Sequence, residues 1–275
     1  QKIIEKLFLD FVPDLVIHCA AQPSHDKAAS IPHLDFSVNA NGTLNLLEAF
    51  RKLKKSDSVF IHVSTNKVYG DGPNHLELIE KEKRYDFADS LYKEGISENF
   101  SIDNCLHSLF GASKVAGDIM AQEYGKYFGL NVGVFRGGCL TGPQHAGVEL
   151  HGFLSYIVKC AKNKIPYTIF GYKGKQVRDQ IHCHDVVSAF EHFARSPKQG
   201  EVYNLGGGKD NSASIMEIID MMKDLGNLDL TYKYDNTSRT GDHICYYSDM
   251  SKFRKDYPEW RLKYSLKDIV EEMMS

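Results

Sequence analysis

The sequence predicts an α/β protein built on a doubly wound parallel sheet, with a smaller α/β lobe towards the C-terminus. Short apolar runs of strand length alternate with longer segments of helical spacing, which is the pattern of consecutive β-α-β units. The first two runs are nearly continuously apolar at their centres, as expected for parallel strands buried on both faces. We expect strands at Asp14–Ala20, Ser58–Val63, Asn131–Phe135, Thr168–Phe170 and Glu201–Leu205, and helices at Asp35–Leu53 and Leu109–Phe128.

The character of the sequence changes after about Pro143, where short elements mix with Gly-rich turns such as Gly171–Lys175. We therefore predict that residues 1–143 form the sheet domain and that residues 144–275 form mostly a second lobe, with some segments returning to the sheet. The chain starts with Gln1 and runs at once into an amphipathic helix. We expect the sheet domain to be partial here, with an N-terminal piece that precedes it.

The composition is that of an ordinary globular protein large enough to bury a sizeable core. The 275 residues are 42% hydrophobic and 25% charged, and the formal net charge is −3. Because the Lys and Arg residues are dispersed, a role on nucleic acid or at a membrane surface is disfavoured. No apolar run approaches the roughly 20 residues that a membrane-spanning helix needs, and no signal peptide opens the chain.

The cysteines and one histidine-rich run bear on the redox compartment and on metal binding. Six cysteines are scattered along the chain without a Cys-x-x-Cys pair, which suggests reduced thiols in a cytoplasmic protein. The run His182–Asp185 has the composition of a metal site. Adjacent residues on a strand point to opposite faces, however, and a tetrahedral site needs converging ligands. We therefore predict no metal site.

Residues suited to ligand binding follow the predicted strands, at the ends where open α/β sheets bind their ligands. The small residues Ala20 and Ala21 would let a flat cofactor approach the backbone, although Ala-Ala pairs are also common in cores. Ser64 and Thr65 place hydroxyl groups at the end of the second strand. In the run Asn39–Thr43 the polar side chains are compatible with helix caps.

The predicted helix at Leu109–Phe128 adds a cationic group. Phe110 and Lys114 are four residues apart and therefore share one helix face. A lysine on that face can hold a ribose or lower a neighbouring pKa. Later in the chain, Arg178 and Arg239 could bind a diphosphate, since a planar guanidinium fits phosphate oxygens. Taken alone, either arginine would equally suit a surface salt bridge.

Several short motifs follow one another in a fixed order: His18–Ala21, Asn39–Thr43, Ser64–Gly70, Lys114, Arg136–Pro143, Gly174–Asp179 with His182 and Asp185, Tyr203–Gly207 and Arg239–Asp242. Together they resemble the extended short-chain dehydrogenase/reductase family, which includes nucleotide-sugar epimerases and dehydratases. Such proteins carry His-x-Ala-Ala, Asn-x-x-Gly-Thr, Ser-Ser/Thr-x-x-Val-Tyr-Gly, Tyr-x-x-x-Lys and an Arg-x-x-Asn-x-x-Gly-Pro-like turn in this order. No single motif is decisive, but the ordered set is specific and spans nearly the whole chain.

The resemblance implies an NAD-dependent enzyme that acts on a nucleotide-diphosphate sugar. In the family, NAD takes a hydride from a sugar carbon while a Ser/Thr–Tyr–Lys group removes the hydroxyl proton. Residues 1–143 would be part of the NAD-binding Rossmann domain, and residues 144–275 would mostly bind substrate. The implied catalytic positions are Thr65, Phe110 and Lys114; the cofactor-binding positions are Ala20, Ala21, Gln22, Asn39, Ser64, Lys114 and Gly138; and the substrate-binding positions are Asn66, Cys139, Arg178 and Arg239.

Related enzymes often dimerise through two helices packed into a four-helix bundle. Asp35–Leu53 and Leu109–Phe128 are the matching segments here, so a cytoplasmic homodimer is expected. No metal, nucleic acid or membrane partner is expected.

Two departures from the family pattern bear on catalysis. The tyrosine of Tyr-x-x-x-Lys is Phe110, which has no proton to exchange. Either another group acts as the base or activity is impaired, and the candidates by motif position are Cys139, His107, Glu149 and Tyr69. In addition, nothing before Asp14 supplies the Gly-x-x-Gly-x-x-Gly turn that cradles a pyrophosphate. Gly206–Gly208 comes too late in the chain for that role and is expected to shape a turn.

The residues after Thr65 favour one reaction within the family. Asn66 and Lys67 stand where the 4,6-dehydratases have the Asp-Glu pair that performs the elimination. Dehydration is therefore disfavoured, and the motifs look most like those of CDP-paratose (CDP-tyvelose) 2-epimerases. This implies epimerisation of a CDP-hexose through a transient keto sugar. The alternatives are a related dehydratase or dehydrogenase, or a non-catalytic nucleotide-binding relative permitted by Phe110.

Overall fold

The computed structural model describes residues 1–149, 152–237 and 242–275, and it divides the chain into two compact units. Each unit is assembled from three segments. Unit 1 comprises Gln1–Gly70, Ile102–Gly137 and Ser188–Asn204, and unit 2 comprises Asp71–Ser101, Gly138–Val187 and Leu205–Ser275.

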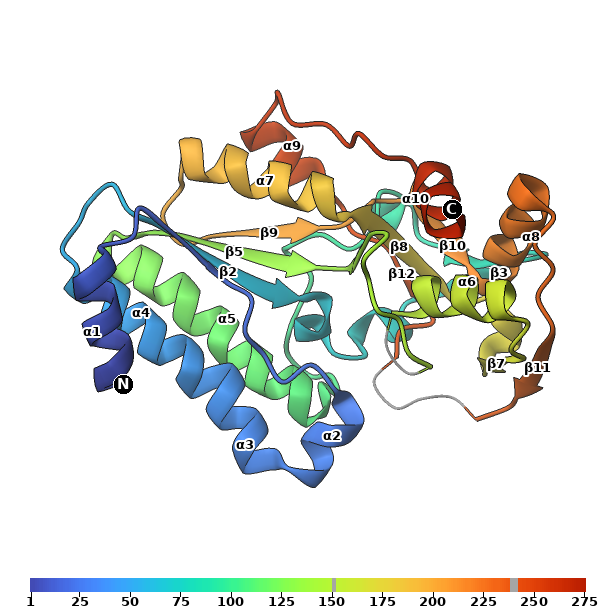
Figure 1. Cartoon of the computed structure of the whole chain (residues 1–275), viewed down its shortest axis with the longest axis horizontal. Coiled ribbons are helices and arrows are strands. Elements are labelled where there is room, and N and C mark those ends of the chain that lie inside the picture. Colours follow the sequence, from blue (N-terminus) through green and yellow to red (C-terminus); the bar gives the residue numbers. More distant parts are fainter. Residues whose placement is uncertain (150–151, 238–241) are drawn as a thin grey trace. The chain divides into compact units, whose positions relative to one another are not determined.

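Unit 1 is built on a sheet with the strand order β1-β2-β5-β9 (Figure 1). β1 and β5 both pair with β2 in parallel, with Val16 opposite Phe60 and His62 opposite Val134. The strands are β1 (Leu15–His18), β2 (Val59–Thr65), β5 (Asn131–Gly137) and β9 (Glu201–Leu205). The helical elements are α1 (Lys2–Phe11), α2 (His25–Ser30), α3 (Pro32–Phe36), η1 (Ser37–Asn41), α4 (Gly42–Lys52), η2 (Asn66–Tyr69), α5 (Ser108–Phe128) and α7 (Cys183–Arg195), of which α7 starts in unit 2.

Helices cover both faces of this sheet, as the alternation in the sequence predicts (Figure 1). On one face, α4 and α5 enclose an apolar core that includes Leu47, Phe50 and Phe60. On the other face, Phe190 and Phe193 of α7 lie edge-on to Phe135 of β5. The predicted α/β fold with a parallel sheet is therefore confirmed.

The expectation that the first strand is buried on both faces is wrong. Leu15 and Ile17 remain 41% and 44% exposed, whereas every residue from Val59 to His62 in β2 is buried. The difference follows from position. β1 is an edge strand with β2 as its one described neighbour, and β2 lies inside the sheet. Apolar continuity alone does not distinguish these two positions.

The predicted helix at Asp35–Leu53 forms as three consecutive elements, α3, η1 and α4. η1 is a turn of π-helix, and a π-turn inserted in a helical run is frequent at functional sites. The interpretation of Asn39 and Thr43 as helix caps is wrong, because both residues lie inside this helical stretch and make no cap. Asn39 instead bonds to Gln22 in the loop after β1, and Thr43 bonds to His18 of β1.

Unit 2 contains a mixed sheet around β8 and a helical layer. β8 (Val177–His182) pairs with β10 (Ser212–Ser214) antiparallel, and with β6 (Cys139–Thr141) and β12 (Cys245–Tyr246) in parallel. The other strands are β3 (Leu78–Glu80) paired with β4 (Tyr85–Phe87), and β7 (Tyr167–Phe170) paired with β11 (Tyr232–Asp235). The helical elements are η3 (Gly72–His75), η4 (Ser90–Tyr92), α6 (Phe153–Asn163), η5 (Tyr172–Gly174), α8 (Ile215–Gly226), α9 (Ser251–Asp256) and α10 (Leu266–Met274).

Local sequence sets the ends of the unit 2 helices. Ser214 and Ser265 cap α8 and α10, and each forms a reciprocal capping box with an acid three residues on, Glu217 and Asp268. Such a box satisfies two backbone N–H groups that a helix start leaves unpaired. These helices and α6 then bury a common apolar core against β7.

None of the helices within the described ranges is both long and apolar enough to cross a bilayer.

One glycine pair lets α5 approach the turn before β9 in unit 1. A Cβ built on Gly125 would lie 2.3 Å from the backbone N and Cα of Gly200, and Gly200 itself has φ +69°. Neither backbone atom can move aside without displacing the turn. The close approach therefore requires glycine at position 125.

We predict that Gly125→Ala lowers the free energy of unfolding by roughly 1–3 kcal/mol, because overpacking against backbone forces a shift. Gly42→Ala on α4 is the matched control, since its added Cβ would meet its nearest neighbour, Ser37 O, at an ordinary 3.7 Å. Because alanine favours helix, the control should be unchanged or stabilised by up to about 1 kcal/mol. Urea unfolding measures both, and equal losses would contradict the packing argument.

Candidate active site

A buried ammonium group lies at the carboxyl end of β2 in unit 1. Lys114, on α5, is 5% exposed, and its Nζ donates a 3.0 Å hydrogen bond to the carbonyl of Val63. Burial lowers the pKa of Lys114 to about 8, although Asp118 and Cys19 favour its charged form. Among the described residues, Val63 O is the acceptor that holds this ammonium, and a lysine has three N–H donors. The group therefore retains donor capacity towards a hydroxyl-bearing ligand.

Thr65 ends the same strand two residues after Val63, and its side chain starts the next turn. Its Oγ1 accepts a 3.2 Å hydrogen bond from the backbone N of Lys67 and so caps η2. This turn packs against the start of α5, where a Cβ on Gly111 would meet Lys67 O at 3.1 Å. The structure thus places Thr65 and Lys114 at the same strand end of unit 1. Asn66, the first residue of η2, is buried beside Thr65.

Phe110 occupies the position of the family's tyrosine, one helical turn before Lys114. It is 7% exposed, and its ring lies against the imidazole of His25 from α2, with 4.7 Å between ring centroids. Tyr69, one of the candidates for a replacement base, is fully buried. Its hydroxyl donates to Asn204 Oδ1 at 2.7 Å and accepts from Arg136 at 3.2 Å. Tyr69 is therefore a member of the supporting structure.

A buried ion pair supports the Lys114 side of the site. Asp118, one turn after Lys114, receives two hydrogen bonds from the guanidinium of Arg136, at 2.9 and 3.1 Å. Ser64 donates to the same carboxylate. Burial opposes the charge on Arg136, but the Asp118 carboxylate and Tyr69 outweigh it and raise the pKa of the guanidinium. Ser64, which was predicted to bind cofactor, is thus engaged with Asp118.

A second polar network fixes the loop that follows β1. Asn39 accepts from the backbone N of Gln22 at 2.9 Å and donates to Gln22 O at 3.1 Å. The carboxylate of Asp35 accepts from Gln22 Nε2 at 2.6 Å and from Ser113 Oγ at 2.6 Å. Gln22 and Asn39 were predicted to bind cofactor, and in the structure their side chains position the loop. Ala20 and Ala21, in the same loop, are exposed.

Two imidazoles lie near Lys114 in the sheet. His18 Nε2 lies 2.9 Å from Thr43 Oγ1, and Thr43 Oγ1 donates its own proton to Asn39 O. His18 Nε2 is therefore the protonated nitrogen of a neutral ring. Burial, together with the charge of Lys114, lowers the pKa of His18 to about 4 and that of His62 well below its ordinary value. Both rings stay neutral near pH 7, which leaves Lys114 as the cation of this cluster.

The predicted residues of unit 2 are placed around β8. Gly138 adjoins the buried Asp179, since a Cβ on Gly138 would lie 2.9 Å from Asp179 Oδ1. This contact gives the glycine a packing role. Cys139 lies opposite Gln180 in the β6–β8 pair. Arg178 donates to Val177 O at 2.8 Å and lies 3.9 Å from the carboxylate of Asp242. Arg239 lies outside the described residues.

Residues 1–206 match the model of the NAD dependent epimerase/dehydratase family. The chain belongs to this family. It is 34% identical to the CDP-paratose 2-epimerase of Salmonella typhi, across 98% of this chain and 79% of that protein. It is 28% identical to the dTDP-glucose 4,6-dehydratase of Salmonella typhimurium, across 92% and 69% of the two chains.

Solved structures of epimerases share the fold. The UDP-glucuronic acid 4-epimerase of Bacillus cereus, in complex with UDP-glucuronic acid and NAD, has a TM-score of 0.77 and 26% identity over 98% of this chain and 76% of its own. The UDP-glucose 4-epimerase of Thermotoga maritima has a TM-score of 0.79 and 24% identity over 99% and 80% of the two chains. The family and the Rossmann-type fold predicted from the sequence are therefore confirmed.

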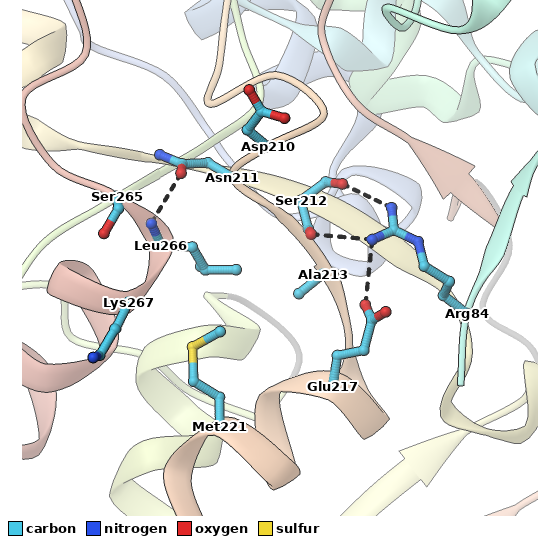
Figure 2. A pocket seen from close by; sticks show the side chains of 10 residues that line it. All are labelled: Arg84, Asp210, Asn211, Ser212, Ala213, Glu217, Met221, Ser265, Leu266 and Lys267. Carbon is cyan, nitrogen blue, oxygen red and sulfur yellow. Dashed lines mark hydrogen bonds and ion pairs between the residues drawn. The ribbon is translucent and has the colours of Figure 1, made fainter. Parts of the chain in front are cut away.

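A pocket with a volume of about 430 Å³ lies in unit 2 (Figure 2). Arg84 lines it and donates to Ser212 Oγ at 2.8 Å, and its guanidinium lies 3.4 Å from Glu217. The charge of Arg84 is thus matched within the pocket wall. None of the described residues predicted for catalysis, cofactor or substrate lines this pocket.

The run His182–Asp185 has protein partners in unit 2. His182 Nε2 lies 2.8 Å from the carboxylate of Glu272, and its ring stacks on Tyr264 at 3.9 Å between centroids. The Asp185 carboxylate accepts from the backbone N–H groups of Lys263 and Tyr264, at 3.0 and 3.2 Å. These residues tie the segment before α10 to the start of α7.

Sequence reasoning missed Asp35, Ser113 and Asp118, although each contacts a predicted site residue. Asp118 lies four residues after Lys114, and Asp35 lies four before Asn39. Helical spacing alone could therefore have placed each acid beside its neighbour. Their long-range partners, such as Arg136, become visible only in the folded chain.

We predict that Lys114 gives the protein a distinctive alkaline stability profile. Between about pH 8 and its ordinary pKa of 10.5, the unfolded chain binds a proton that the folded chain has released. The free energy of unfolding that Lys114 contributes therefore rises with pH across this window. The full effect is roughly 3 kcal/mol, at about 1.4 kcal/mol per pKa unit.

Urea unfolding at several pH values between 7 and 10.5 measures this dependence, with Lys114→Met as the comparison. The difference in stability between Lys114→Met and the wild type should change in favour of the wild type as pH rises. Parallel curves for the two proteins would exclude the lowered pKa.

We also predict that Arg136→Leu lowers the free energy of unfolding by roughly 3–5 kcal/mol, because it leaves the buried Asp118 carboxylate without its cation. Arg195→Ala, which removes an exposed ion pair with Glu191 on α7, is the control and should cost less than about 1 kcal/mol. Thermal and urea unfolding distinguish the two. A loss for Arg136→Leu as small as that of the control would contradict a supporting role for this network.

Proposed function

We propose that this protein catalyses the NAD-dependent epimerisation of a nucleotide-activated sugar through a transient keto intermediate, in the manner of a CDP-hexose 2-epimerase. The observation that carries the proposal is the buried Lys114 ammonium, held by Val63 O at the strand end that Thr65 completes. Identity of 34% to a CDP-paratose 2-epimerase over nearly the whole chain supports the substrate class.

The donor set of unit 1 fits the nicotinamide ribose of NAD. Lys114 has N–H donors beyond the one that Val63 O accepts, and two adjacent ribose hydroxyls could accept them. The exposed Ala20 and Ala21 offer a surface without side-chain bulk. By motif position alone, Gly138 of unit 2 is also assigned to the cofactor, and Ser64 would support the cofactor site through Asp118. When bound, NAD accepts and returns a hydride. The chain's own residues orient the sugar and handle the hydroxyl proton.

The polar side chains of the site then have distinct roles. Thr65 would hydrogen-bond the sugar hydroxyl that is oxidised, and the Lys114 cation would favour its deprotonation by raising the local positive potential. Three further residues would hold the site in shape without touching the reacting atoms, since each is fixed in a buried network: Gln22, Asn39 and Ser64. Arg178 and Arg239 would bind the substrate diphosphate, and Asn66 and Cys139 would line the sugar site. We assign cofactor binding mainly to residues 1–143 and substrate binding mainly to residues 144–275.

Epimerisation is favoured over dehydration by the residues after Thr65. Asn66 carries an amide that cannot donate a proton as an acid, and Lys67 is cationic where the dehydratases have Glu. Elimination of water from the sugar needs one protein group that acts as an acid and another that acts as a base. We further propose that the protein acts as a cytoplasmic homodimer through α4 and α5, on the basis of the helical segments identified from the sequence.

The test is turnover of CDP-, UDP- and dTDP-hexoses by the protein with saturating NAD, followed by proton NMR of the sugar. We expect inversion at one sugar carbon, with Lys114→Ala and Thr65→Val slowed by roughly 10²–10⁴-fold. Thr65→Ser keeps the hydroxyl, and Lys126→Ala removes an exposed cation from the same helix. Both controls should stay within a few-fold of wild type.

Other outcomes would replace the proposal. Loss of water from the sugar would identify a dehydratase, and net reduction of NAD would identify a dehydrogenase. Tight binding of NAD without conversion of any of these sugars would identify a non-catalytic relative.

A further inference from the structure

A histidine imidazole takes up the space beside Phe110 in unit 1. His25 is the first residue of α2, and its ring centroid lies 4.7 Å from that of Phe110, with 57° between the ring planes. α2 follows the loop at the carboxyl end of β1, and His25 is half-buried there. A titratable ring therefore lies against the one helix position at which the chain lacks the family's phenol.

Ser108 holds this imidazole in place. Its Oγ lies 3.0 Å from His25 Nδ1 and also accepts from the backbone N of Gly111 at 3.3 Å. Ser108 has φ +61°, a left-handed conformation that is unfavourable for a residue with a Cβ. Strained residues of this kind cluster at functional sites. Ser108, at the start of α5, thus presents its hydroxyl to His25 while its backbone adopts an unfavourable conformation.

The position of His25 relative to Lys114 follows from α5. Phe110 and Lys114 lie one turn apart on one face of the helix, so their side chains are neighbours about 5–6 Å apart at Cβ. His25 lies over the first of these side chains, and the ammonium of the second lies at the end of β2. His25 therefore lies against the side chain that precedes Lys114 by one turn on the same helix face.

From this arrangement we propose that His25 is the catalytic acid/base that replaces the missing phenol. The assignment rests on the proposed epimerase function. In the oxidation step, the O–H bond of the sugar hydroxyl breaks and its proton moves to an imidazole nitrogen of His25. The C–H bond of the same carbon breaks as C=O forms, and its hydride would be taken up by the NAD that the site would hold. In the reverse step the carbonyl regains a hydride on its other face and the proton from the imidazolium.

The other groups of unit 1 are less suited to this task. His107 Nε2 donates to the carbonyl of Val68 at 2.9 Å, and Cys105 Sγ lies 3.9 Å from its Nδ1, so both ring nitrogens have protein partners. Tyr69 is fully buried and engaged with Asn204 and Arg136. Histidine is also the side chain that ordinarily titrates near neutral pH, which suits a group that must take and return a proton.

The first test compares His25→Gln with His33→Gln, an exposed histidine on α3. His25→Gln should lower kcat by roughly 10²–10⁴-fold, as expected for a lost general acid/base, while KM stays within a few-fold. His33→Gln should leave both unchanged. Turnover retained in full by His25→Gln overturns the assignment.

The second test restores the phenol. In the double variant His25→Gln with Phe110→Tyr, the smaller side chain at position 25 leaves room for the added hydroxyl. We expect kcat to recover at least roughly tenfold over His25→Gln alone, because the tyrosine supplies the general acid/base at the family's position. A purely structural role for His25 predicts no recovery, and its absence in a folded double variant would contradict the proposal.

A third readout does not depend on turnover. In protein with ¹⁵N-labelled histidine and NAD, the imidazole signals of His25 are assigned by their loss in His25→Gln. Addition of CDP-glucose should move these signals and leave those of His33 in place, and unmoved His25 signals count against contact with substrate. Absence of turnover by the wild type would reject the proposed function, whereas turnover that His25→Gln retains rejects the His25 assignment alone.

Discussion

The buried ammonium of Lys114 is the constraint on which the rest of unit 1 depends. A cation in a poorly solvated setting must find compensation, and here a single backbone carbonyl, Val63 O, and the nearby Asp118 carboxylate provide it. Burial still prevails, and the pKa of Lys114 falls to about 8. The ammonium is therefore weakly stabilised in the fold itself. A ligand with oxygen acceptors would bind it favourably, because the ammonium still has unsatisfied N–H donors.

The groups around this lysine are fixed by two separate buried networks. Asp118 and Arg136 anchor α5 to β5 on one side, and Asp35 and Asn39 anchor the loop after β1 on the other. Charged hydrogen bonds of this kind hold side chains within narrow limits of position. Much of what the family motifs encode in this chain is therefore support for the site. The residues left to face a ligand are few.

The sequence predicts the class of fold and most strand positions because strand ends, helical spacing and ordered motifs are local signals. It predicts Thr65 and Lys114 as members of one site because the ordered family motifs assign both residues to it, and in the structure Lys114 bonds to Val63 O, two residues before Thr65. It fails where the outcome depends on distant neighbours. Leu15 belongs to an apolar run whether or not another strand covers it. The sequence gives no sign that Asp118 is buried, because its partner Arg136 is brought to it only by the fold. His25 belongs to none of the family motifs, and only its contact with the Phe110 ring in the folded chain marks it as a candidate.

Asp179 of unit 2 joins three turns that are far apart in the sequence. Its buried carboxyl accepts from the backbone N–H groups of Gly208 and Ser248, and a Cβ on Gly206 would lie 2.1 Å from its Oδ2. With Gly138 on its other side, the acid fits because glycines stand at positions 138 and 206. A larger residue at position 138 or 206 would exclude Asp179, and loss of Asp179 would remove the need for glycine at those positions. In evolution the acid and its glycines should therefore be kept or lost together, as a covarying set rather than as independent sites.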